Sequence, residues 1–145
     1  MGPKIQEKIK ATVAVANTSG TVAALVGTAV NATGYSRARF IFSFGNGAAT
    51  TAEFESGIGI WESATSGGTY TSRSTAVIGT NITSGVVSSA AVTVEIELPI
   101  STAKPWLKVS GGSNLSTGLP HSCIVELYDV NSMPITTGAN TVVTI

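Results

Sequence analysis

Apolar residues in this chain recur at every second position, in short runs that glycine and small polar residues interrupt. In the clearest run, Val92, Val94, Ile96 and Leu98 alternate with polar residues until Pro99. This period of two is that of a β-strand with one buried face. No window forms a convincing amphipathic helix, whose apolar residues would recur every 3.6 positions. The pattern therefore predicts an all-β chain.

Runs of the same kind predict the other strands, with turn residues between them. Phe40, Phe42 and Phe44 share one face of their strand, so we expect this strand at the centre of the core. The sequence Ser66-Gly67-Gly68-Thr69 predicts a hairpin turn. The predicted strands cover residues 9–15, 21–26, 35–44, 52–62, 70–78, 92–98, 106–110, 122–128 and 140–145.

Eight or nine short strands predict a two-sheet antiparallel sandwich. A jelly roll is the expected closure, and an immunoglobulin-like sandwich is the alternative. The 145 residues fit one domain. We expect an N-terminal arm over residues 1–10, followed by a single sandwich domain over residues 11–145. The stretch 79–90, rich in Ser, Thr and Gly, predicts a long loop.

Charge is scarce in this chain. Eight basic and eight acidic residues give a net charge of zero, and 11% of residues are charged, against about 25% in typical domains. Such a composition favours a surface that partners cover, and a domain kept soluble by Ser and Thr hydroxyls is the equally supported alternative. Nucleic acid is not an expected partner because its phosphates require clustered Lys and Arg. No run approaches the ~18 apolar residues of a membrane-spanning helix, so we expect no membrane partner and no cleaved signal peptide.

The chain has one histidine, His121, one cysteine, Cys123, and one aspartate, Asp129. His121 follows Pro120 in a predicted loop, and Cys123 is predicted to be a small buried hydrophobe. Residues two apart on a strand share a face but lack hydrogen-bonding reach, so we expect no Cys–His nucleophile. A zinc site needs more His and Cys ligands, and a calcium site needs more carboxylates. The sequence therefore predicts no enzyme, no metal and no cofactor.

Two pairs of carboxylates, Glu53 with Glu55 and Glu95 with Glu97, have strand spacing on an apparently exposed face. A glycosidase would need one carboxyl group with a raised pKa beside one that stays ionised. A solvated strand face, or salt bridges across the sheet to Arg37 and Arg39, is the favoured interpretation.

Trp61 and Trp106 are the candidate surface aromatics. Exposed tryptophans can form a platform on which sugar rings stack, with Tyr70 as a further member. The favoured interpretation is that both tryptophans cap the edges of the core.

A longer pattern joins several of these elements. Gly34-Tyr35 precedes the aromatic strand that ends at Phe44, and Ile60-Trp61-Glu62-Ser63 leads into the hairpin over residues 66–71. Lys104-Pro105-Trp106-Leu107-Lys108-Val109 follows later. This layout resembles that of small structural proteins of tailed bacteriophages, most of all head decoration (cement) proteins. The resemblance covers roughly residues 33–128, and Pro105-Trp106 stands where the layout usually has Arg-Tyr.

The resemblance implies a small β-sandwich or jelly roll that binds the outside of a capsid shell and bridges neighbouring coat subunits. It implies no catalytic residue and no cofactor. The expected partners are the major capsid protein and further copies of the chain, in a dimer or a trimer. The expected location is the outer surface of the virion, after assembly in the host cytoplasm.

The N-terminal arm is the candidate coat-contacting segment because it is basic and unpatterned, with an ordinary frayed terminus as the alternative. Further contact candidates are the loop 79–90 and the strand 141–145. A carbohydrate-binding module that uses Trp61 and Trp106 and a phage tail or baseplate component are the alternative functions. The candidate coat-contact residues are Lys4, Ile5, Lys8, Ile9 and Lys10.

Overall fold

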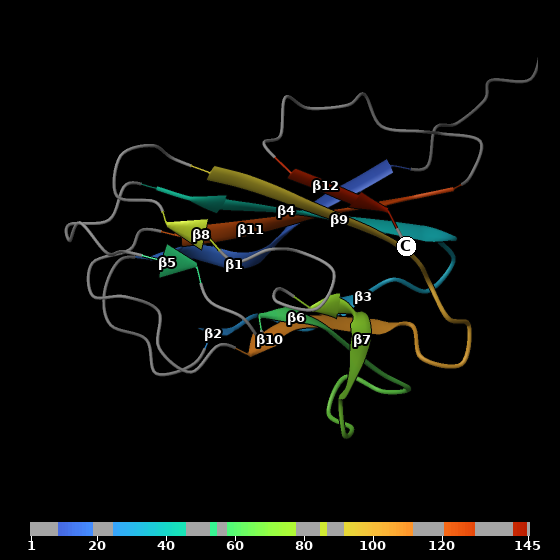
Figure 1. Cartoon of the computed structure of the whole chain (residues 1–145). Helices are drawn as coiled ribbons and strands as arrows, with labels where there is room; N and C mark the ends of the chain where they lie inside the picture. The colour runs from blue at the N-terminus through green and yellow to red at the C-terminus, as the bar shows by residue number, and fades with distance from the viewer. Residues whose placement is uncertain are drawn as a thin grey trace, which may run out of the picture.

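The computed structural model describes residues 9–18, 25–45, 53–54, 58–77, 85–86, 92–111, 121–129 and 141–144. All regular secondary structure in these ranges is β-strand, and ten of the twelve strands form two sheets that pack face to face (Figure 1). The predicted two-sheet sandwich is confirmed. The strands are β1 (Ile9–Thr18), β2 (Leu25–Val26), β3 (Val30–Asn31), β4 (Arg37–Phe44), β5 (Glu53–Phe54), β6 (Gly59–Ser63), β7 (Thr71–Val77), β8 (Gly85–Val86), β9 (Val92–Pro99), β10 (Trp106–Gly111), β11 (His121–Tyr128) and β12 (Thr141–Thr144).

The first sheet has the strand order β1-β11-β4-β9-β12. Its pairs are antiparallel except the last, because β12 runs parallel to β9. The second sheet has the order β2-β10-β6-β7, and β3 also pairs with β10. A separate two-stranded sheet joins β5 to β8.

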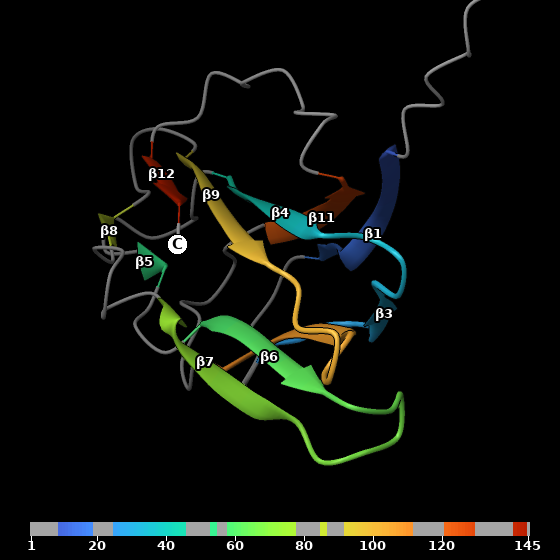
Figure 2. The same cartoon turned by 90° about the vertical axis from the view of Figure 1, so that its right-hand side faces the viewer.

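Strand pairing in the two large sheets is nested. β1 pairs with β11, β2 with β10, β4 with β9, and β6 with its neighbour β7. Figure 2 shows the chain leaving β9 in the first sheet and entering β10 in the second. Most of the pairing therefore joins segments that are far apart in the sequence.

The hydrophobic core lies between the two sheets, and β4 is central to it as predicted. Phe40, Phe42 and Phe44 are buried, and the rings of Phe42 and Phe44 stack with centroids 6.2 Å apart. Each such side chain contributes about 1.5–3 kcal/mol through burial. The strands beside β4 in the first sheet and the strands of the facing second sheet contribute further buried apolar residues, which include Val94, Ile96, Leu98, Val125 and Leu127 from the first sheet and Ile60, Leu107 and Val109 from the second.

Some strand boundaries differ from the prediction. The run over residues 52–62 forms two strands in different sheets, β5 and β6, instead of one. β3 has two residues, too few for an alternating pattern to show. β1 begins at Ile9, so the last two residues of the predicted arm belong to the first sheet. Of the predicted strand 21–26, only β2 lies within the described residues.

Candidate functional site

His121 and Cys123 lie on the buried face of β11. His121 is the first residue of this strand, so its prediction as a loop residue is wrong; a proline directly before a strand does not interrupt the ladder. The Cys123 thiol donates a 3.6 Å hydrogen bond to the carbonyl oxygen of Ile124. Burial raises the pKa of Cys123, which keeps the sulfur protonated at neutral pH. The prediction of Cys123 as a small buried hydrophobe is confirmed.

Arginines of β4 and glutamates of β9 form ion pairs across the first sheet. Arg37 Nε lies 2.6 Å from Glu97 Oε1, and Arg39 Nη2 lies 2.8 Å from Glu95 Oε2. Arg39 Nη1 also lies 3.7 Å from Glu126 Oε2 on β11. The predicted salt bridges are confirmed, and they give Glu95 and Glu97 a structural role that requires no acid–base chemistry.

The expectation that these carboxylates lie on an exposed face is wrong for Glu95. Glu95 is 2% exposed and Arg39 is 4% exposed, whereas Arg37 and Glu97 are half-buried. Alternation shows that two residues share a face of a strand, but it does not show whether that face is covered. Of the other predicted carboxylate pair, only Glu53 lies within the described residues, in β5.

Two observations on the part of the chain that the structure describes bear on the binding of metals and small ligands. No group of three or more His, Cys, Asp and Glu residues there could hold a metal ion. A cavity of about 100 Å³ is lined by residues 32–35, Ile100, Thr102 and Pro105. Typical ligand pockets measure about 300–1,000 Å³, so this cavity has room for a few atoms only.

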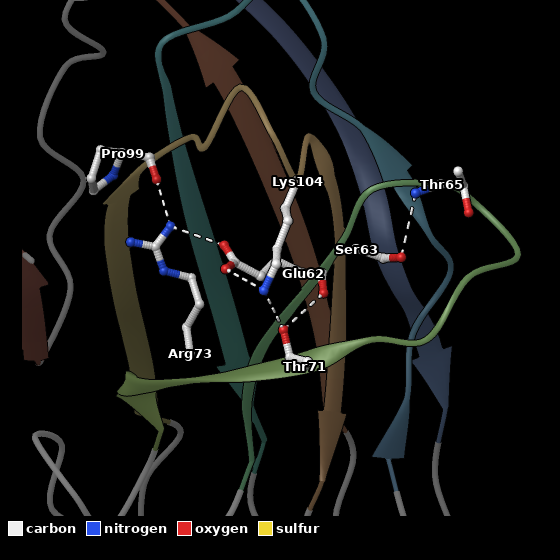
Figure 3. A network of polar contacts seen from close by, with 7 residues as sticks. All are labelled: Glu62, Ser63, Thr65, Thr71, Arg73, Pro99 and Lys104. Carbon is white, nitrogen blue, oxygen red and sulfur yellow. Dashed lines mark hydrogen bonds and ion pairs between the residues drawn. The ribbon is translucent and has the colours of Figure 1, made fainter.

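Glu62 on β6 is the centre of a polar network that ties the two sheets together (Figure 3). Its carboxylate lies 3.4 Å from Arg73 Nη1 on β7 and 3.5 Å from Lys104 Nζ in the β9–β10 connection. Arg73 donates a 2.7 Å hydrogen bond to the carbonyl oxygen of Pro99 at the end of β9. Because β9 belongs to the first sheet and β6 and β7 to the second, these contacts fix the β6–β7 hairpin against the opposite sheet.

Thr71 completes this network on the hairpin side (Figure 3). Lys104 Nζ donates a 2.9 Å hydrogen bond to Thr71 Oγ1, which in turn donates to the carbonyl oxygen of Glu62 at 3.4 Å. The network thus consists of the Glu62 carboxylate, the two cations that contact it, and the Thr71 hydroxyl group, which accepts from Lys104. We assign it a structural role in holding the hairpin.

The turn of the β6–β7 hairpin follows the predicted position. Gly68 N donates to Thr65 O at 3.2 Å, and Tyr70 Oη donates to Ser66 O at 3.1 Å. A Cβ atom on Gly68 would lie 2.7 Å from Ser63 Oγ and 2.6 Å from Thr65 Oγ1. Glycine at this position therefore lets the turn fold closely against the end of β6.

Trp61 and Trp106 lie on the outer face of the second sheet. Leu107 and Ile60 are buried in the core, and adjacent strand residues point to opposite faces, so both tryptophans point away from the core. Both are half-buried. The interpretation that they cap the core edges is therefore wrong.

The register places the two tryptophans side by side on that face. Trp61 pairs with Lys108 and Ser63 pairs with Trp106, which makes Trp61 and Trp106 diagonal neighbours, about 7–8 Å apart in such a ladder. Lys108 Nζ lies 5.3 Å from the ring centroid of Tyr70, within the range of a cation–π contact. Trp61, Tyr70, Trp106 and Lys108 are termed the aromatic face below.

A second apolar surface lies on the outer face of the first sheet. Val13 on β1 and Ile124 on β11 are 55% and 46% exposed, and they lie directly opposite each other. Ile41 on β4, half-buried, pairs with Ile124 and continues the row. Val13, Ile124 and Ile41 are termed the apolar row below.

Sequence reasoning missed the exposure of Val13 because β1 is irregular. Strict alternation over residues 9–15 would put Val13 and Val15 on the same face of the strand, but the pairing with β11 shifts between these two residues. Ala14, in the shift, is buried in the core, while Val13 points to solvent. Such a bulge changes the face that residues on either side present, and nothing in the sequence marks it.

The predicted coat-contact residues fall in two groups. Lys4, Ile5 and Lys8 lie outside the described residues. Ile9 and Lys10 belong to β1 and pair with the end of β11, and Lys10 is exposed. They are therefore part of the sandwich.

The two further contact candidates are described only in part. Within the predicted loop 79–90 the described residues form β8, which pairs with β5. Of the predicted strand 141–145, residues 141–144 form β12 at the edge of the first sheet.

The aromatic face and the apolar row belong to different sheets, so the molecule presents two separate apolar surfaces. Among the residues that the structure covers, no helix is long and apolar enough to span a membrane. Comparison of the chain with protein-family models, with curated proteins and with solved structures found no match.

Proposed function

We propose that this chain is a non-enzymatic structural protein, a capsid decoration protein that binds the outer surface of a phage head and bridges neighbouring coat subunits. The apolar row carries this proposal, because Val13 and Ile124 present an exposed apolar surface on the outer face of the first sheet. Such a surface suits a protein partner. The resemblance of residues 33–128 to head decoration proteins supplies the identity of that partner.

The nested strand pairing supports the same proposal. We interpret it as a jelly roll, in which antiparallel strand pairs are wound into two facing sheets. Jelly rolls recur in viral capsid proteins and in lectins. The fold is therefore compatible with attachment to a capsid and with binding of a sugar. The choice between these two functions depends on the apolar row and the aromatic face.

The energetics of the apolar row fit repeated weak contacts. Covering the exposed parts of Val13 and Ile124 would contribute about 2 kcal/mol for each copy. This is too little for stable binding of one molecule, but a regular shell offers many equivalent positions. A copy that bridges two coat subunits gains further affinity because its second contact is intramolecular.

Co-sedimentation of the purified protein with phage heads tests the proposal. We expect saturable binding at a stoichiometry set by the symmetry of the shell, and fewer bound copies for Ile124→Lys. Ser72→Lys is the matched control, since it adds the same charge at an exposed position of β7 in the other sheet. A chain without residues 1–8 tests the predicted contact arm.

Two results would reject the head proposal. One is the absence of binding to heads by the unmodified protein. The other is equal loss of binding in Ile124→Lys and Ser72→Lys, which would exclude the apolar row as the contact. Sedimentation with isolated tails then tests the alternative of a tail or baseplate component.

A second candidate function, glycan binding, is favoured by the aromatic face. Two tryptophans that are diagonal neighbours on one sheet face provide adjacent rings for stacking, and Lys108 supplies a hydrogen-bond donor beside them. Trp61→Ala and Trp106→Ala should each abolish binding to a glycan identified on a glycan array, while Ile124→Lys should leave it intact. If the unmodified protein binds no glycan on the array, this candidate is rejected.

A further inference from the structure

β1 forms one edge of the first sheet, and no other strand of the described chain pairs with its outer side (Figure 2). An edge strand presents backbone N–H and C=O groups that another extended segment can bind. The chemistry of this edge therefore specifies a β-strand as its partner.

The available part of the edge is short and has a defined end. Residues 9–13 pair with β11 in unbroken register, and the shift follows Val13. At Ala14 the edge is occupied, because Thr28 N donates a 2.8 Å hydrogen bond to the Ala14 carbonyl oxygen. A further strand can therefore add alongside residues 9–13.

We infer that residues 9–13 pair antiparallel with the same residues of a second copy, about a two-fold axis at Ala11. In this register Ala11 lies opposite Ala11 of the second copy, and Val13 lies opposite Ile9. Lys10 lies opposite Thr12. The pairing uses all of the available edge and stops on both sides before the bulge.

The distribution of charge selects a second copy as the partner. Lys10 is the one charged residue within 9–13, and in this register the two lysines do not face each other. Glu126 pairs with Ala11, so the two Glu126 residues would lie three strand spacings apart, about 14 Å. That distance exceeds the screening length of about 8–10 Å at physiological salt. A net charge of zero also removes overall repulsion between copies.

Val13 adds an apolar contribution to this pairing. Its side chain is 55% exposed in one copy, and a neighbouring strand would cover part of that surface. An interface of five residues on each side is small, so the dimer is weak. This inference does not rest on the capsid proposal, because the pairing forms between copies in the absence of heads.

Disulfide trapping tests the register. In Ala11→Cys the paired Cα atoms would lie about 4.5–5.5 Å apart, within the range of a disulfide. In the matched control Thr12→Cys, the two cysteines would lie about 8 Å apart, beyond that range. Cys123 is buried and does not compete for oxidation. We expect rapid dimer formation by Ala11→Cys under mild oxidation and at least about tenfold slower formation by Thr12→Cys.

Sedimentation equilibrium from about 1 µM to about 1 mM measures the dimer without cross-linking. We expect concentration-dependent dimers that Val13→Lys weakens about tenfold or more, while Ser72→Lys dimerises like the unmodified chain. A monomer over the whole range, or equally fast cross-linking of Thr12→Cys and Ala11→Cys, overturns the inference. Dimers that fail to bind heads would instead reject the capsid proposal and leave the inference standing.

Discussion

Arg39 and Glu95 meet at 2.8 Å on the face of the first sheet that points away from the hydrophobic core, and both are almost completely buried. They come from the neighbouring strands β4 and β9. Transfer of two charges out of water costs several kcal/mol for each ion, and the attraction between them offsets that cost only while both are present. Each side chain therefore stabilises the fold mainly by compensating the buried charge of the other.

Replacement of Glu95 alone should destabilise the fold strongly. Glu95→Leu leaves the buried Arg39 guanidinium without its 2.8 Å partner, and we expect a loss of about 3–5 kcal/mol in the free energy of unfolding. The double variant Arg39→Met/Glu95→Leu should lose less than Glu95→Leu, because both charges of the 2.8 Å pair are removed and Glu126, the remaining partner of Arg39, keeps 23% side-chain exposure. Urea denaturation measures all three proteins. Losses that simply add up in the double variant would contradict this account.

Stability should fall at alkaline pH through Tyr128. Burial, together with the neighbouring Glu97, raises the pKa of Tyr128 to about 12, from about 10 in the unfolded chain. The folded state therefore holds this proton over a pH range in which the unfolded state releases it. The stabilisation is complete below pH 10 and is lost as the pH rises to about 12. Denaturation between pH 9 and 12 should show a shallower decline for Tyr128→Phe than for the unmodified chain; equal slopes would refute the assignment.

The network at Glu62 should contribute modestly and depend on salt. Its carboxylate has 16% side-chain exposure, and its contacts with Arg73 and Lys104 are 3.4 and 3.5 Å long. We expect Glu62→Gln to lower the free energy of unfolding by about 1 kcal/mol at low salt. The difference should shrink in 1 M salt, where the screening length is about 3 Å. Thermal melts at the two salt concentrations measure this, and a difference independent of salt would exclude an electrostatic cause.

Gly27 and Gly67 provide a matched pair of glycine substitutions. A Cβ atom on Gly27 would lie 2.8 Å from the Ala14 carbonyl oxygen and 3.1 Å from Val109, whereas one on Gly67 would meet nothing within 4 Å. We expect Gly27→Ala to cost about 1–3 kcal/mol, since the contact is with backbone that cannot move aside. Gly67→Ala should cost nothing measurable. Similar melting temperatures for the two variants would show that the packing at Gly27 is looser than described.

Cys123 should resist alkylation in the folded protein. Its side chain is buried, so a reagent cannot reach the sulfur. Burial also raises the pKa of the thiol, which keeps the sulfur in its unreactive protonated form. Mass spectrometry after iodoacetamide treatment at pH 8 should show no modification without denaturant and complete modification in 6 M guanidinium chloride. Rapid labelling of the native protein would show that β11 opens readily.

The central strands of the first sheet could be predicted from the sequence because each alternates clearly. Phe40, Phe42 and Phe44 defined the core face of β4, and the opposite face then placed Arg37 and Arg39 beside the glutamates of β9. The remaining inference was that β4 pairs with β9. The opposite charges of the two strands, at matching spacing, favoured that pairing. The β6–β7 hairpin followed from its glycines in the same way.

Other features depend on long-range register and could not be predicted. The side-by-side placement of Trp61 and Trp106 follows from the pairing of β6 with β10, which the alternation of either strand leaves undetermined. The exposure of Val13 depends on a bulge, and the burial of Glu95 depends on what surrounds an outer face. His121 was misplaced because Pro120 was taken to indicate a loop, although the ladder of β11 begins directly after it.

The nested pairing has a consequence for the order in which the chain folds. β11 lies between β1 and β4 in the first sheet, although it follows both in the sequence by many strands. During synthesis, β1 and β4 emerge first and have no shared neighbour until β11 leaves the ribosome. Pairing across such a separation is slow because a long loop must close before any contact forms. One side of β4 therefore has no partner strand until nearly the whole domain has been made, although β9 can pair with its other side earlier.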